Sequence, residues 1–273
     1  MKNIEAYINQ IIEGDCLQVM EDLPDKSIDF ILCDLPYGMT ANPWDKIINV
    51  QKLWQQYQRI IKENGTIALS GQGIFTAHLI LSNPTWFRYK MVWIKSKAPN
   101  FLSANKQPLR KHEDICIFYK TQPVYHPQMW MDKPYDRGMR KTNASGNYGA
   151  FKTSHCKSNG SRYPYDLLFF EEEHDDWFYF KSAETEGKVW HPTQKPVALG
   201  RYLIRTYTDP GDIVLDNACG SGSFPVAAIR ENRKFIGIEQ NKGAFSLKTK
   251  PVDFVQISRE RVRAALDDQR LFI

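Results

Sequence analysis

Short apolar runs alternate along this sequence with segments in which apolar residues recur at helical spacing. The runs lie at residues 8–12, 30–33, 66–69, 89–94, 115–119, 213–215 and 235–238. They are short and rich in β-branched or aromatic residues, which is typical of buried strands. The segments with helical spacing lie at residues 17–23, 50–61, 196–207, 224–230 and 258–266. This strand–helix–strand alternation predicts an α/β fold with a doubly wound, mostly parallel sheet.

Residues 121–188 interrupt this pattern. They are rich in Pro, Tyr, Gly, Asn, Lys and Arg, and their periodicity is weak apart from a short apolar run at 167–170. A long segment of this kind is typical of a functional insertion dominated by loops. We therefore divide the chain into residues 1–120, an insertion at 121–188, and residues 189–273, which complete the same domain as the first segment.

Charge is distributed unevenly along the chain, whose net charge is +5. Between Arg88 and Arg162 there are 15 Lys and Arg residues but four acidic ones. Such an excess favours a polyanionic partner such as nucleic acid, with a solubilising surface as the alternative. No apolar stretch is long enough to predict a membrane span. The five cysteines never form a C-x-x-C pair, which favours reduced thiols in a cytoplasm and predicts no metal site.

A glycine loop follows the apolar run at 213–215. Asp216 closes that run, Gly220 and Gly222 follow, and Glu239 closes the next run about 20 residues later. The glycines allow the backbone to approach a ligand closely, and an acidic residue at the position of Glu239 can hold ribose hydroxyls. The loop matches neither G-x-G-x-x-G nor a P-loop, so it favours a nucleoside ligand over a dinucleotide or ATP. An ordinary strand–helix turn is the alternative.

Asp34, Leu35, Pro36 and Tyr37 follow the run at 30–33. Asp34 and the main-chain carbonyl of Leu35 can accept the two hydrogens of an exocyclic amine. Pro36 stiffens the segment, and the ring of Tyr37 can stack on an unstacked base. These residue types therefore suit chemistry on the amino group of a base that has left the helix. The alternative is a strand that ends in a proline turn with a core tyrosine.

The order of these motifs resembles that of the DNA amino-methyltransferases of the β class. Residues 34–37 resemble the family's catalytic D-P-P-Y, and residues 216–222 resemble its D-P-F-x-G-S-G cofactor motif. Glu239 matches the acidic residue that grips the ribose, and Asp15 matches the one that contacts the adenine of the cofactor. Residues 191–196 resemble the H-P-T-x-K-P run that contacts the methionine end.

The resemblance implies a seven-stranded, Rossmann-like methyltransferase sheet, with a catalytic half at 1–120, a target-recognition insertion at 121–188 and a cofactor-binding half at 189–273. It implies that S-adenosylmethionine is the cofactor and that double-stranded DNA is the substrate, methylated by base flipping and direct in-line attack. A homodimer, a cognate restriction endonuclease and a prokaryotic or phage-infected cytoplasm also fit the family. The residues that it assigns to cofactor binding are Asp15, Thr193, Lys195, Asp216, Ala218, Gly220, Ser221, Gly222 and Glu239.

Two motifs depart from the family pattern: Leu35 replaces the first proline of the catalytic motif, and Asn217 with Ala218 replaces Pro-Phe in the cofactor motif. Family members with Asp at the first catalytic position usually act on adenine N6, which makes adenine the expected base. Cytosine N4 is the first alternative, because it offers the same amino group. RNA or protein-amide methylation, and an inactive DNA-binding protein, are the remaining ones.

Overall fold

The computed structural model describes residues 3–39, 45–98, 100–140, 154–168, 189–190, 193–240 and 252–270. Their central feature is an eight-stranded sheet in the order β1-β12-β11-β2-β3-β5-β4-β10. The strands are β1 (Gln10–Glu13), β2 (Ile28–Cys33), β3 (Ile61–Gly71), β4 (Phe87–Ile94), β5 (His112–Phe118), β10 (Leu167–Leu168), β11 (Ile213–Asp216) and β12 (Lys234–Glu239). Only β5 is reversed, because it pairs antiparallel with both β3 and β4. The expected mostly parallel sheet is therefore confirmed.

The sheet has one described strand more than the seven expected. The additional strand is β10, which belongs to the insertion and pairs in parallel with β4 at the sheet edge. Leu168 of β10 is completely buried in the core. Burial of this side chain removes apolar surface from water, which explains why a two-residue strand of the insertion packs against the main domain.

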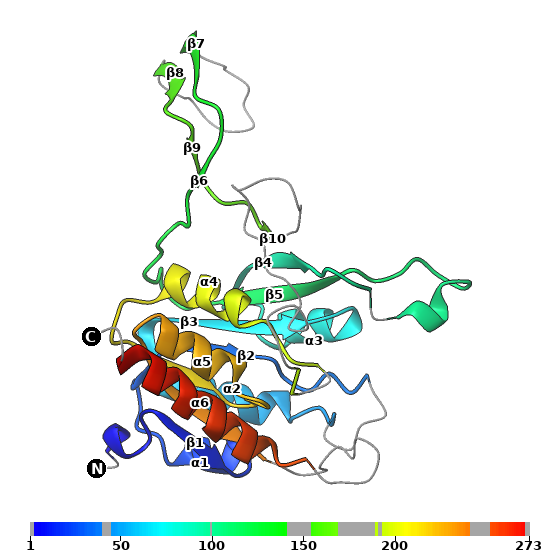
Figure 1. Ribbon diagram of the computed structural model, residues 1–273, viewed down its shortest axis with the longest axis vertical. Coiled ribbons are helices and arrows are strands. Elements are labelled where there is room, and N and C mark those ends of the chain that lie inside the picture. Colours follow the sequence, from blue (N-terminus) through cyan, green and yellow to red (C-terminus); the bar gives the residue numbers. More distant parts are fainter. Residues whose placement is uncertain are drawn as a thin grey trace.

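Helices cover both faces of the sheet, as expected for a doubly wound fold (Figure 1). One face is covered by α1 (Cys16–Glu21), α2 (Val50–Ile60) and α3 (Ile74–Ser82). The other is covered by α4 (Val197–Tyr207), α5 (Ser223–Arg230) and α6 (Phe254–Arg270). Two short 3₁₀ helices, η1 (Ile4–Ala6) and η2 (Phe101–Ser103), complete the described helices.

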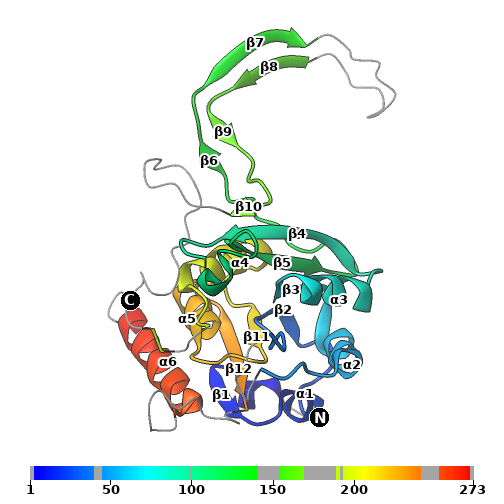
Figure 2. The same ribbon diagram turned by 90° about the vertical axis from the view of Figure 1, so that its right-hand side faces the viewer.

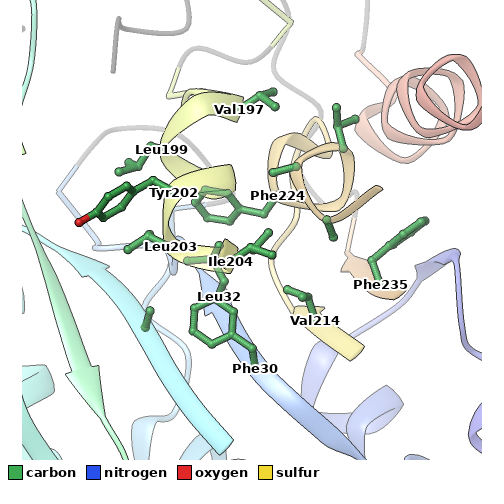
Figure 3. Close-up of a cluster of buried hydrophobic side chains, with 14 of the residues drawn as sticks. Phe30, Leu32, Val197, Leu199, Tyr202, Leu203, Ile204, Val214, Phe224 and Phe235 are labelled. Carbon is green, nitrogen blue, oxygen red and sulfur yellow. The ribbon is translucent and has the colours of Figure 1, made fainter. Parts of the chain in front are cut away.

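The alternation of side chains along β2 supplies both cores. Phe30 and Leu32 point toward α4 (Figure 3), whereas Ile31 and Cys33 belong to the cluster on the opposite face. All four side chains are fully buried. Because successive residues of a strand point to opposite faces, a continuous apolar run is what a central strand covered on both sides requires.

Part of the insertion forms a β-ribbon, which the sequence reading as loop did not predict. In it β6 (Trp130–Met131) pairs with β9 (Ser161–Arg162), and β7 (Tyr135–Arg140) pairs with β8 (Ser154–Ser158). The ribbon projects away from the sheet (Figure 2). Neither of its faces packs on a core, so no apolar alternation marks the strands. The Arg137 and Arg162 guanidinium groups instead lie 4.7 and 4.8 Å from the Tyr135 ring centroid.

Two kinds of feature, a membrane-spanning helix and a metal-binding cluster, are absent from the described residues. Among them, no helix is long and apolar enough to cross a membrane. Within the same residues, no group of three His, Cys, Asp or Glu side chains is arranged to hold a metal ion. All five cysteines are free thiols, and four of them are buried.

Candidate active site

The loops that follow β2 and β11 lie side by side. These strands are hydrogen-bonded parallel neighbours, with Phe30 opposite Val214 and Ile31 opposite Leu215. Asp34 follows β2 directly, and Asp216 is the last residue of β11. The expectation that both loops share one edge of a single sheet is therefore met, which is where open α/β sheets bind their ligands.

A buried hydrogen bond also joins the two halves of the chain. Tyr57 of α2 donates its hydroxyl to the Asn217 side-chain oxygen over 2.6 Å. Asn217 is one of the two departures from the family's cofactor motif. Exchange of Asn217 for proline would remove the acceptor of the Tyr57 hydroxyl, and a buried donor without a partner is costly. The departure thus has a structural role: it holds α2 against the glycine loop.

The loop that follows β2, which carries the candidate catalytic residues, is held by two carboxylates. Asp34 Oδ1 accepts a 2.8 Å hydrogen bond from the Tyr37 hydroxyl. Asp45, a buried residue not singled out from the sequence, accepts from the backbone N–H groups of Gly38 and Met39 at 2.8 and 2.9 Å. Gly38 has a φ of +68°, which favours glycine at this turn. The loop that carries residues 34–37 is therefore held in one conformation by short-range hydrogen bonds.

The Tyr37 ring is held in place as well. Its centroid lies 4.9 Å from that of Phe75 in α3, and the Lys195 ammonium lies 5.7 Å from it. Burial and the nearby Asp34 carboxylate raise the pKa of Tyr37 well above its ordinary value. The hydroxyl consequently stays protonated and continues to donate to Asp34.

Asp34 belongs to a largely buried cluster of four charged side chains, the others being Glu113, Lys95 and Lys195. Lys195 Nζ lies 2.5 Å from Asp34 Oδ2 and 3.2 Å from Glu113 Oε2, and Glu113 also pairs with Lys95. Two carboxylates and two ammonium groups cancel formally, which is how buried charges are tolerated. The family resemblance assigns Lys195 to cofactor binding, and in the structure its ammonium pairs with Asp34, the candidate catalytic residue.

The pKa values in this cluster reflect competition between burial and pairing. Burial raises the pKa of Asp34, and attraction to Lys195 offsets part of that rise. Burial also opposes ionisation of Glu113, but Lys195 and Lys95 outweigh it and lower the pKa of Glu113. For Lys195, the two carboxylates outweigh burial and raise its pKa. The ammonium therefore remains charged and is the permanent counter-ion of Asp34.

The glycine loop is closed by Glu239, whose Oε2 accepts a 2.8 Å hydrogen bond from the Gly220 N–H. Gly220 and Gly222 have φ values of +51° and +80°. The backbone therefore takes the left-handed conformations for which the glycines were singled out. Asp216 is buried, and burial raises its pKa well above the ordinary value. The Ala218 N–H lies 3.3 Å from Asp216 Oδ1, so this carboxyl helps shape the turn.

Ser221 connects the loop to two later segments. Its hydroxyl donates to Gln194 Oε1 at 3.1 Å, and Arg261 of α6 donates to the Ser221 carbonyl at 2.6 Å. Thr193 is exposed beside Gln194, whereas His191 and Pro192 lie outside the described residues. Gln194 and Arg261 were not predicted from the sequence, because their role depends on contacts between distant segments.

Asp15 lies at the same edge of the sheet, because Glu13 of β1 pairs with Glu239 of β12. Its Oδ1 accepts from the Leu17 N–H and caps α1, and its Oδ2 accepts from Gln240 Nε2, both at 2.9 Å. Asp15, Glu239 and Asp216 thus end or follow three adjacent strands. The side chains of Asp15 and Glu239, which lie beside the glycine loop, can accept hydrogen bonds from the hydroxyl and amino groups of the adenosine part of S-adenosylmethionine.

A methyl group at Gly222 would be poorly tolerated. A Cβ built there lies 2.4 Å from Ser258 Oγ and 3.3 Å from the Ser258 Cα. We expect Gly222→Ala to destabilise the fold by about 2 kcal/mol or more, through both φ strain and the clash. Gly211→Ala is the control, because Gly211 has a φ of +91° but open space at its Cβ. The measurement is the free energy of unfolding from urea titration. Equal losses in the two variants would contradict a contribution from the clash with Ser258.

A sequence model of a protein family covers both of the loops described above. The model described as DNA methylase, of the N6/N4 type, matches residues 28–250 and so spans both loops. This chain belongs to the DNA methylase family. It is accordingly a DNA methyltransferase of the N6/N4 class, and the family's methyl donor is S-adenosylmethionine.

Relatives of this DNA methylase include the type II methyltransferase M.HinfI of Haemophilus influenzae. The two are 27% identical over 269 residues, covering 88% of this chain and 67% of the relative. The solved M1.HpyAVI–SAM complex has a TM-score of 0.58 at 21% identity and covers 93% of this chain and 98% of its own. The PvuII DNA methyltransferase (cytosine-N4-specific) has a TM-score of 0.57 at 16% identity, covering 96% and 95%. These structures share the fold of the DNA methylase described here.

Proposed function

We propose that this DNA methylase methylates adenine N6 in double-stranded DNA after the target base has rotated out of the helix. The observation that carries the proposal is the position of Asp34 and Leu35 at the sheet edge, beside the glycine loop. Asp34 is held by Tyr37 and Lys195, so its carboxylate is preorganised to accept a hydrogen bond from an incoming amine.

The residues of the catalytic loop divide the work. Asp34 and the Leu35 carbonyl accept the two hydrogens of the amino group, which leaves the lone pair of the nitrogen free to act as a nucleophile. Positive charge that builds on this nitrogen strengthens its hydrogen bond to Asp34, so the carboxylate favours the transition state over the ground state. Pro36 and Tyr37 provide a rigid surface on which the base stacks.

The cofactor is held at the other side of the same edge. S-adenosylmethionine supplies an electrophilic methyl group on a sulfonium sulfur. In this proposal Glu239 accepts hydrogen bonds from the ribose hydroxyls and Asp15 from the adenine amine. The turn formed by Asp216, Ala218, Gly220, Ser221 and Gly222 lines the ligand. Thr193 and Lys195 belong to the segment at its methionine end, and Lys195 links that segment to Asp34.

Adenine is favoured because the first catalytic residue is Asp34, and the expected product is N6-methyladenine. The test incubates the protein with duplex DNA and S-adenosylmethionine labelled in its methyl group, followed by digestion to nucleosides. Label in N4-methylcytosine would replace the proposal by its first alternative. A parallel reaction with RNA, and calorimetric titration with the cofactor, address the RNA-methylating and inactive alternatives.

The insertion at 121–188 is proposed to contact the DNA target. Its described part supports this role, because the ribbon of β6 to β9 extends away from the sheet and carries Arg137, Lys157 and Arg162. Cations in this arrangement would bind phosphates and fix the duplex over the active site. We place the enzyme in the cytoplasm of a prokaryotic or phage-infected cell, and a homodimer and a cognate endonuclease remain proposed partners.

A further inference from the structure

The loop that joins β4 to β5, described at residues 95–98 and 100–111, lies at the same edge of the sheet as the candidate active site. Figure 1 shows it protruding on the side toward which β2 runs. Its two ends are joined by a 2.8 Å hydrogen bond from the Lys95 N–H to the Lys111 carbonyl. The Lys95 side chain pairs with Glu113, which contacts Lys195 and through it Asp34. The base of the loop is thus three ion pairs from the catalytic carboxylate.

The outer part of this loop has its own hydrogen bonds. Asn100 Oδ1 accepts from the Arg110 N–H at 2.8 Å. The Ser103 carbonyl accepts from the N–H groups of Lys106 and Gln107 at 2.9 and 3.1 Å. These bonds close a compact turn around η2, so whatever stands at its tip is presented in a fixed arrangement.

Two large apolar side chains stand at this tip. Phe101 is 68% exposed and Leu102 is 85% exposed. They are adjacent in the sequence, and nothing in the described chain covers them. A single exposed apolar residue needs no explanation, but a pair on a structured turn next to an active site indicates a binding surface.

The charge around the tip identifies its partner. Residues 95–111 contain five Lys and Arg residues and no acidic residue. A cationic loop with an apolar tip complements duplex DNA, which has phosphates on its outside and apolar base faces within its stack. DNA-bending proteins insert phenylalanine and leucine between base pairs in this way.

We propose that Phe101 and Leu102 insert into the base stack next to the target and fill the space from which the base is extruded. This inference rests on the proposed function, because it requires a flipped base. Extrusion costs a few kcal/mol of lost stacking and pairing. Apolar side chains in the vacated space replace part of the lost stacking and so keep the flipped state populated.

The test compares the double variant Phe101→Ser and Leu102→Ser with the control Leu81→Ser. Leu81 is 75% exposed near the end of α3, one helix length from the active-site edge. Each protein methylates two duplexes: one fully paired, and one with the target base opposite an abasic position. On the paired duplex, we expect the double variant to be about tenfold to a hundredfold slower, whereas the control matches the unmodified protein. On the unpaired duplex, extrusion is inexpensive, so we expect the double variant to recover to within about threefold.

Three outcomes would overturn the inference. In the first, the double variant matches the control on both duplexes. In the second, it loses activity equally on both, which would indicate that the tip contributes only to general DNA affinity. A shift in sedimentation coefficient that accompanies the loss would instead assign the tip to contact with a second copy of the chain. If the unmodified protein methylates neither duplex, the proposed function itself fails, and that result is distinct from all three.

Discussion

Asp34→Ala is expected to lower the single-turnover rate of methyl transfer by about a hundredfold or more, the loss typical when one preorganised polar contact to a developing charge is removed. The dissociation constant for S-adenosylmethionine should change by less than about threefold, because the carboxylates proposed to bind it are on other strands. Rapid-quench measurement of labelled methyl transfer and calorimetric titration with the cofactor give the two quantities separately.

Asp34→Asn is the matched variant for this prediction. It keeps one acceptor oxygen of the same shape, so transfer should be faster than in the alanine variant. It also removes the counter-ion of Lys195, which then depends on Glu113 alone. Both variants should therefore unfold at lower temperature, since each leaves the buried cluster with excess positive charge. Full activity in Asp34→Ala would refute the assigned hydrogen bond, whatever the change in stability.

Glu239→Ala is expected to raise the dissociation constant for S-adenosylmethionine by about tenfold to a hundredfold. A hydrogen bond to a charged acceptor contributes about 1.5–3 kcal/mol, and this carboxylate is proposed to accept from the ribose hydroxyls. The variant also removes the acceptor of the Gly220 N–H, which loosens the glycine loop. Isothermal titration calorimetry measures the change directly.

Two further variants separate these contributions. Glu239→Gln keeps an acceptor for the Gly220 N–H without the charge, so its affinity should lie between those of the alanine variant and the unmodified protein. Glu13→Ala is the control, because Glu13 is exposed and pairs with Glu239 in the sheet register. An unaltered dissociation constant in Glu239→Ala would remove this residue from the cofactor site. A raised dissociation constant in Glu13→Ala would instead indicate that the loss of affinity comes from general surface charge.

The central strands and their loops could be predicted because local rules fix them. β2, β11 and β12 are apolar runs closed by an acidic residue, and parallel strands that share helical crossovers end at one edge. Helix α3 was not predicted, because its apolar residues do not follow a helical stripe. The ribbon in the insertion was missed for a different reason, since an exposed two-stranded ribbon needs no apolar face.

The candidate site shows the same division. Asp34 is recognisable from the short motif at residues 34–37, and Gly220 and Gly222 are recognisable from the motif at residues 216–222. The contact between Lys195 and Asp34 spans 161 positions, and the contact between Glu113 and Lys95 exists only once β4 and β5 have paired. The sequence alone therefore did not predict that these residues pair with one another. Asp45 has no motif at all, and its role follows from the turn that it closes.

The pairing of β2 with β11 has a consequence for biosynthesis. The Ile213 N–H donates to Asp29 Oδ2 across 184 positions of the chain. At ribosomal speeds of about 5–20 residues per second, β2 waits roughly 10–40 s for this neighbour to be translated. During that interval the nascent chain exposes an apolar strand edge that other nascent chains could join. Slow synthesis or crowding on polysomes should therefore promote aggregation of the amino-terminal half before the enzyme is complete.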